Sequence, residues 1–334
     1  MDAMKRRAGR SRPGRFCNGS ALLACAALAA CLLVFASQTQ AQEKLRVGRA
    51  VPQAFSFVPV DVGIKYGIFR KYGLEIESSA FAGDAKMQQG MAADSLDIAL
   101  GSGPAMAFIA KGAPIRAVAA FAGRPLLLVL AVRSDGSIKS VADLKGRRVS
   151  VSTVGSLTYW LVDELSSRQG WGPGGIIPTP LGSMKGQLAA LKRKEIDGIV
   201  TELSTAYNME KAGEGKILLH FGDLVKDFHI HVVFATNKLI AGRPDAIRAF
   251  LKGFFETIAF MRQHKAETVQ VAKGVMEADD AIASRVYDAL MPMFQDNGKF
   301  DPKALAVLRR SYVELKMLDQ EPDMSKLYTE AYLQ

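Results

Sequence analysis

The chain has 334 residues, 49% of them hydrophobic, and a formal net charge of +10 at pH 7. Six of its 43 basic residues and one of its 33 acidic residues lie in residues 1–42, so the remainder keeps 37 and 32, a net charge of +5. That excess is small, and no block of Lys and Arg with interleaved aromatic residues accompanies it, so nucleic-acid binding is not expected. The remaining length is sufficient for two lobes.

Residues 1–41 have the layout of a secretory signal peptide. A basic start leads into the apolar run 21–36, and a small-residue cleavage site ends at Ala41. The run is too short for a membrane span, so a soluble periplasmic protein is expected. The alternative is a lipid anchor at Cys31, because Leu-Ala-Ala-Cys is similar to a lipoprotein box. Every cysteine of the chain lies in this segment, which leaves the exported part without a thiol.

After residue 43 the chain alternates strand patterns with helix patterns. Strands are expected at residues 44–51, 75–79, 96–100, 115–121, 126–132, 148–152, 196–200 and 230–235. Helices are expected at residues 60–66, 84–93, 105–111, 157–165, 182–194 and 207–212, and over most of the chain after 244. This alternation is typical of an α/β protein with mostly parallel, doubly wound sheets.

Two parts of the chain repeat the same order of elements. Residues 44–105 and 147–207 each run strand, turn, helix, strand, helix, and buried apolar strands precede and follow the second unit. We therefore expect two Rossmann-like lobes joined by two crossover strands. Lobe 1 is expected at 42–130 and 235–334, and lobe 2 at 131–234. Sheets of this kind bind ligands beyond the carboxyl ends of their strands.

The stretch 146–165 carries the first candidate site. A short strand leads into a turn from Thr153 to Ser156, and a helix follows. Backbone N–H groups at such a helix start have no partner within the helix, and the helix dipole favours an anion or a polar ligand there. An ordinary turn capped by Ser156 is the alternative. The turn lacks the Lys of a phosphate-binding loop, so nucleotide hydrolysis is not expected.

Several further segments carry a family resemblance. They are 67–77 (similar to GxFxxxGLxVE), 95–99, 111–115, 142–149, 189–191 and 195–198. Because it contains these segments in this order, the chain resembles the solute-binding proteins of nitrate/sulfonate/taurine-type ABC importers. Those proteins share a fold with binders of the thiamine pyrimidine precursor. The resemblance covers nearly the whole exported chain. It implies a type 2 periplasmic-binding-protein fold, a cleft between the lobes, an ABC permease as membrane partner, a monomer, no cofactor and no catalysis.

The resemblance also places a ligand between three loops, which contain Gln53, Phe55, Ser56, Ser102, Gly103, Thr153, Gly155 and Ser156. Further ligand-binding candidates follow from their own positions: Glu202 after the strand 196–200, Arg124 before the first crossing and His229 near the second crossing. A carboxylate at Glu202 favours a ligand with an amine or hydroxyl group, whereas Arg124 can pair with a sulfonate or carboxylate. For each residue an ordinary structural role is the alternative: a packed aromatic ring, a helix cap or a surface charge.

The histidines raise a metal hypothesis. His229 and His231 alternate on one strand and so face the same side, with His220 as a possible third ligand. No cysteine or suitably spaced carboxylate accompanies them, so no metal site is expected.

The expected ligand is a small organic anion: a sulfonate, a carboxylate or a taurine-like zwitterion. The helix-start turns and the family resemblance both favour it. The alternative is a neutral heteroaromatic solute such as a thiamine-pyrimidine precursor, which Phe55, Tyr159 and Trp160 support. A secreted enzyme of the same fold is the remaining alternative. Resemblance to the desulfinase of this fold implies a catalytic cysteine, which the exported chain lacks.

Overall fold

The computed structural model describes residues 42–154 and 156–333. The expected signal peptide, with Cys31, lies outside the described residues, and so does Gly155. Among the described helices, none combines the length and the hydropathy that a membrane crossing requires.

The first sheet has five strands in the order β2-β1-β3-β10-β4. Its strands are β1 (Glu43–Arg49), β2 (Leu74–Ala80), β3 (Ile98–Ser102), β4 (Ile115–Ala122) and β10 (His231–Thr236). β1 pairs in parallel with β2 and β3, and β10 runs antiparallel between β3 and β4. β3 and β10 are buried along their whole length, and for β10 this agrees with the buried apolar strand expected there.

The second sheet repeats this arrangement in the order β7-β6-β8-β5-β9. Its strands are β5 (Leu128–Arg133), β6 (Arg148–Val151), β7 (Ile177–Pro180), β8 (Gly198–Glu202) and β9 (Gly215–His220). β6 pairs in parallel with β7 and β8, and β5 runs antiparallel between β8 and β9. The chain is therefore an α/β protein with two mixed, five-stranded sheets of the same topology.

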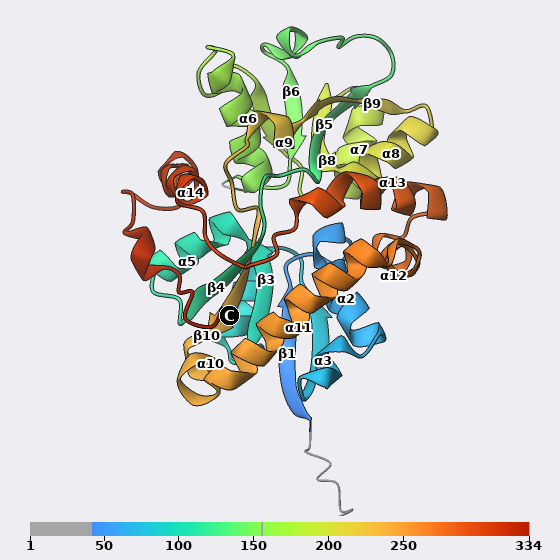
Figure 1. Cartoon of the computed structure of the whole chain (residues 1–334). Helices are drawn as coiled ribbons and strands as arrows, with labels where there is room; N and C mark the ends of the chain where they lie inside the picture. The colour runs from blue at the N-terminus through green and yellow to red at the C-terminus, as the bar shows by residue number, and fades with distance from the viewer. Residues whose placement is uncertain (1–41, 155, 334) are drawn as a thin grey trace, which may run out of the picture. The chain divides into compact units, whose positions relative to one another are not determined.

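Helices flank both sheets (Figure 1). They are α2 (Val58–Lys65), α3 (Ile68–Lys71), α4 (Asp84–Ala92), α5 (Ala107–Ala110), α6 (Leu157–Arg168), α7 (Met184–Lys192), α8 (Leu203–Lys211), α9 (Phe221–Leu224), α10 (Asn237–Gly242), α11 (Pro244–Gln263), α12 (Lys265–Met276), α13 (Asp280–Leu290) and α14 (Pro302–Glu314). The 3-10 turns include η1 (Phe55–Phe57) and η2 (Gly103–Met106). The helical region expected after residue 244 is thus confirmed.

The chain crosses between the sheets twice. β4 ends at Ala122 and β5 begins at Leu128, and β9 ends at His220 and β10 begins at His231. The expected lobe boundaries at 130/131 and 234/235 therefore fall inside β5 and β10, each of which belongs to one sheet along its whole length.

Each sheet contains the same turn before its central strand. Asp94 and Lys194 both have positive φ, 57° and 62°, at the end of the preceding helix. Three residues later, Asp97 and Asp197 each accept a hydrogen bond from the backbone N–H of a neighbouring strand. This shared geometry shows that the two sheets are structural repeats, as the repeated element order predicts.

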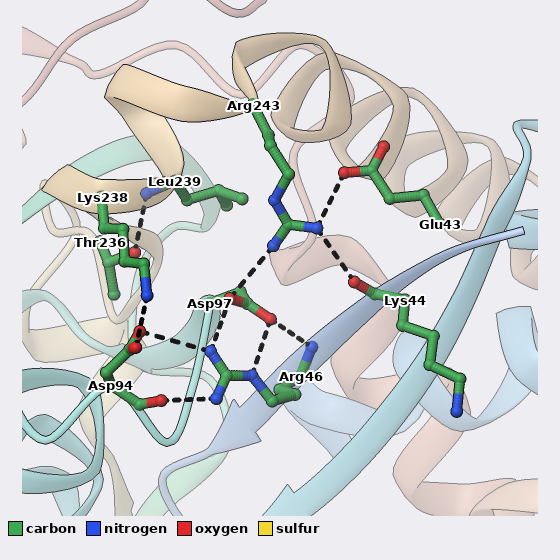
Figure 2. Close-up of polar contacts among 9 residues, drawn as sticks. All are labelled: Glu43, Lys44, Arg46, Asp94, Asp97, Thr236, Lys238, Leu239 and Arg243. Carbon is green, nitrogen blue, oxygen red and sulfur yellow. Dashed lines mark hydrogen bonds and ion pairs between the residues drawn. The ribbon is translucent and has the colours of Figure 1, made fainter.

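Asp97, which directly precedes β3, is the centre of an ion-pair network (Figure 2). Its carboxylate binds the Arg46 guanidinium through two contacts, at 2.8 and 3.0 Å, and lies 3.2 Å from Arg243. Arg243 also binds Glu43 at 2.9 Å, which connects the start of β1 to the start of α11. Burial acts to raise the pKa of Asp97, but hydrogen bonds and charge from Arg46 outweigh it and hold that pKa below its usual value.

Two edge strands, β7 and β9, are absent from the sequence-based expectation. β7 carries Pro178 and Pro180, which usually argue against a strand. The strand lies at the end of the sheet, paired only with β6, where proline is tolerated. Pro59 lies in the first turn of α2, where its missing N–H costs nothing.

Candidate functional site

The candidate site consists of the carboxyl ends of the central strands β3 and β8 and the residues beside them, which we call the first edge and the second edge. The first crossing joins the two sheets at these ends. The first edge holds Ser102 and His231, whose Cα atoms are register partners. The second edge holds Glu202, the register partner of Leu128. Because His231 also pairs with Ala122, the six-residue path from Ala122 to Leu128 joins the two edges over at most about 20 Å. Both edges are carboxyl ends of parallel strands, where α/β proteins bind ligands.

At the first edge, Ser102 is bonded to Asp84, the first residue of α4. The Asp84 carboxylate accepts hydrogen bonds from the Ser102 backbone N–H at 2.9 Å and from its Oγ at 2.8 Å. Gly101 makes this approach possible, since a Cβ there would lie 2.5 Å from Asp84 Oδ1. Burial raises the pKa of Asp84, although the bonds from Ser102 act in the opposite direction.

The loop after β1 places its three predicted site residues in different surroundings. Gln53 is exposed, whereas Phe55 is 1% exposed and packs against Tyr287 and Phe294, with ring centroids 6.3 and 6.0 Å apart. Ser56 is fully buried, and its Oγ has no hydrogen-bond partner among the described residues. Phe55 therefore has a packing role, while ligand contact by Gln53 and Ser56 stays a prediction.

Gly103 and His229 meet through their backbones. A Cβ at Gly103 would lie 2.0 Å from the His229 carbonyl oxygen, so glycine is required for this contact. The His229 imidazole points to the C-terminal segment, where its Nε2 accepts a hydrogen bond from the Asp301 N–H at 2.8 Å. Burial lowers the pKa of His229 to about 4. Nδ1 of the same ring is buried without a hydrogen-bond partner among the described residues, so ligand contact by His229 stays a prediction.

His231, which is absent from the predicted ligand-binding set, lies directly opposite Ser102. Its ring is 4.9 Å from that of Phe57 and 5.7 Å from that of Phe121. Neither ring nitrogen makes a hydrogen bond of normal geometry among the described residues, and burial lowers the pKa of His231 to about 4, although a backbone contact with Gly101 acts in the opposite direction. The alternation of His229 and His231 was the sequence signal that one of them reaches this edge.

At the second edge, Ser156 begins α6 as its N-cap. Its Oγ accepts a hydrogen bond from the Tyr159 N–H at 3.2 Å, donates to the Thr153 carbonyl oxygen and lies 2.9 Å from Thr158 Oγ1. The Thr153 side chain is exposed, and Gly155 is outside the described residues. Ser156 therefore caps α6, as the alternative interpretation of the turn expects. Contact of Ser156 with a ligand remains a prediction.

Glu202 is the last residue of β8 and precedes α8. Its side chain makes no capping bond and no other hydrogen bond within the described part of the chain, and the residue is half-buried. Burial raises the pKa of Glu202 to about 7. Arg124, within the crossing between the two edges, is exposed.

Two cavities among the described residues are lined by none of the residues of either edge. One of about 410 Å³ is lined by Arg133, Leu188, Lys192 and Met209 among others, and one of about 440 Å³ by Arg168, Asp223, Lys226 and Val307 among others. Neither is lined by a predicted site residue. Within residues 42–154 and 156–333, no group of three or more His, Cys, Asp or Glu side chains is placed to hold a metal ion.

Comparison with known proteins identifies the family. The NMT1/THI5-like family model matches residues 54–268, so the chain belongs to this family. No curated protein matches the sequence.

Solved structures confirm the fold. The periplasmic aliphatic sulphonate-binding protein of Escherichia coli superimposes with a TM-score of 0.73 at 19% identity, covering 86% of this chain and 92% of that one. The periplasmic nitrate-binding protein of Synechocystis gives 0.67 at 14% identity, covering 86% of both chains. A mutant of DszB in complex with biphenyl-2-sulfinic acid gives 0.64 at 15% identity, covering 87% and 97%. The chain therefore has the generic periplasmic-binding-protein fold that the sequence resemblance implies.

Proposed function

We propose that this protein is the solute-binding component of an ABC importer and acts in the periplasm, exported by the signal peptide expected at residues 1–41. The observation that carries the proposal is the arrangement of Ser102 and Glu202 at carboxyl edges of two repeated sheets joined by a short crossing. The family match supports it, as do the sulphonate-binding and nitrate-binding functions of the structural relatives. A membrane permease is then its partner.

The proposed mechanism is closure of two lobes around the solute. We place the lobe boundaries in the two crossings, at residues 123–127 and 221–230, because each strand on either side belongs to one sheet. Contacts made by both lobes stabilise the closed state, so solute binding shifts the population toward it. No chemical step is needed.

Helices α13 and α14 supply contacts that support this closure. Glu314 of α14 accepts a hydrogen bond from Trp160 Nε1 in α6 at 2.7 Å. Arg285 of α13 pairs with Glu210 in α8 at 3.1 Å, and its guanidinium lies 3.6 Å from the centre of the Tyr207 ring. These C-terminal helices thus bind the helices of the second sheet directly.

For the solute we propose a small organic anion: a sulfonate, a carboxylate or a taurine-like zwitterion. The start of α6 with its hydroxyl-bearing residues, and the exposed Arg124, offer donors and positive charge for the acidic group. The second candidate is a neutral heteroaromatic solute, which the half-buried Glu202 carboxyl favours because it can accept a hydrogen bond from a ring amino group.

A thermal-shift panel tests the proposal. It contains taurine, ethanesulfonate, isethionate, β-alanine, propionate, nitrate, 4-aminopyrimidine and pyrimidine. We expect at least one member to raise the melting temperature by saturable binding to a single site. Shifts from heterocycles alone would refute the anion class, and no shift from any member would refute the proposed solute classes.

Two substitutions locate the site. Ser156→Ala and Gln53→Ala should weaken binding of the active panel member while leaving the chain folded. Lys216→Ala on β9, away from both edges, is the control that should leave affinity unchanged. Unchanged affinity in both site variants would contradict the predicted location.

A further inference from the structure

The two sheet edges can be compared residue by residue because the sheets are repeats. The same sequence offset that relates Asp97 to Asp197 relates Ser102 to Glu202, the last residues of β3 and β8. It also relates Asp84 to Met184, the first residues of α4 and α7. Corresponding positions at the two edges therefore hold different chemistry.

In the first edge, the polar group at the strand end has a partner within the protein. Asp84 accepts two hydrogen bonds from Ser102, and Gly101 leaves room for the carboxylate. The donor and the acceptor satisfy each other, so this pair needs nothing from outside the chain.

In the second edge, the corresponding partner is missing. Thr201 takes the place of Gly101, and its hydroxyl lies 3.5 Å from the sulfur of Met184. A thioether is only a weak acceptor and has no hydrogen to donate to a carboxylate. Glu202 is consequently left half-buried, with no hydrogen-bond donor bound to it from any described residue.

A half-buried carboxyl that receives no donor from the protein can form hydrogen bonds only with water. A solute that displaces this water must supply a donor of its own, because the carboxyl would otherwise be buried without a hydrogen bond. We propose that Glu202 selects the solute by accepting a hydrogen bond from its amino group, so that the transported solute carries an amine. This inference rests on the proposed solute-binding function and narrows it.

The proposal assigns both ends of the solute to the second edge of the candidate site. An acidic group of the solute is directed to the start of α6, where the helix dipole favours negative charge. The amino group is directed to Glu202 at the end of the neighbouring strand of the same sheet. Among the solutes proposed above, taurine-like zwitterions meet both conditions, and simple sulfonates and carboxylates meet only the first.

Matched pairs of solutes test the proposal on the full wild-type chain. The pairs are taurine with ethanesulfonate, β-alanine with propionate, and 4-aminopyrimidine with pyrimidine, each titrated by isothermal calorimetry. A charged hydrogen bond typically changes affinity by about ten- to hundred-fold. We expect the amino-bearing member of the binding pair to bind at least about ten-fold more tightly, by the same principle.

The variant Glu202→Gln tests whether Glu202 causes the preference. It keeps the size of the side chain and removes the charge, and we expect it to reduce the ratio within the pair to near unity. Glu195→Gln, an exposed glutamate before β8, is the matched control and should retain the wild-type ratio. Circular dichroism and thermal unfolding establish that both variants are folded.

The outcomes separate this inference from the function on which it rests. Equal affinity of the two members of a pair, tighter binding of the amine-free member, or an unchanged ratio in Glu202→Gln would overturn the role of Glu202 and leave the solute-binding function intact. Failure of every member of the eight-compound panel to bind would overturn the proposed solute classes together with this inference.

Discussion

Replacement of His231 by phenylalanine should make the protein more resistant to acid. The His231 ring lies among the aromatic rings of Phe57 and Phe121, and neither of its nitrogens makes a hydrogen bond of normal geometry within the described residues. Burial lowers the pKa of His231 from 6.5 to about 4, because a protonated ring would lose its hydration there. Phenylalanine keeps the aromatic packing and removes the titrating group.

The sign follows from the protons bound in each state. Between pH 6.5 and about 4 the unfolded chain binds a proton at His231 that the folded chain excludes, so the free energy of unfolding falls as the pH falls through this window. The drop in pKa corresponds to roughly 3 kcal/mol. His231→Phe does not incur this loss. The free energy of unfolding of His231→Phe minus that of the wild type should therefore be about 2–3 kcal/mol larger at pH 4.5 than at pH 7.5.

Urea unfolding at both pH values measures the effect. His220→Phe, which replaces an exposed histidine at the end of β9, is the control for the loss of a histidine. His229 stays in every variant, so its own contribution cancels from the comparison. A stability difference between His231→Phe and wild type that is the same at pH 7.5 and pH 4.5 would refute the reasoning.

Three further substitutions test the structural account by urea unfolding at pH 7.5. Asp97→Asn should lower the free energy of unfolding by about 1–3 kcal/mol, because Arg46 loses its charged partner; a loss below about 0.5 kcal/mol, the level of a surface pair, would contradict this. Glu314→Ala should cost about 1–2 kcal/mol and change the emission of Trp160, whose indole N–H it binds, whereas an unaltered spectrum would show that the contact is absent in solution. Ser156→Ala should cost about 1 kcal/mol through loss of the α6 cap, and equal stability would argue against that cap.

The sequence correctly predicted those strands whose burial requires a run of apolar residues. β5 and β10 are strands where continuous apolar runs were found, and the repeated order of elements anticipated two sheets of the same topology. β7 and β9 were missed because both are edge strands. Two of the four residues of β7 are proline, and β9 is only half-buried along most of its length, so neither shows a buried-strand pattern.

The site was harder to predict because its chemistry depends on pairs distant in sequence. A loop phenylalanine gives no local signal of its partners, and Phe55 proves to pack against Tyr287 and Phe294. The unsatisfied state of Glu202 depends on Met184, a residue that carries no functional motif. The missing partner is found only when corresponding positions of the two repeats are compared.

The most direct test of the central claim is native mass spectrometry of the full chain purified without denaturation from its own host and then incubated with the active panel member. The account predicts one small solute bound per chain, released on denaturation with its mass unchanged. A chain that carries no solute after incubation, or that releases a chemically converted product, would contradict the conclusion that this protein captures a solute and passes it on unaltered.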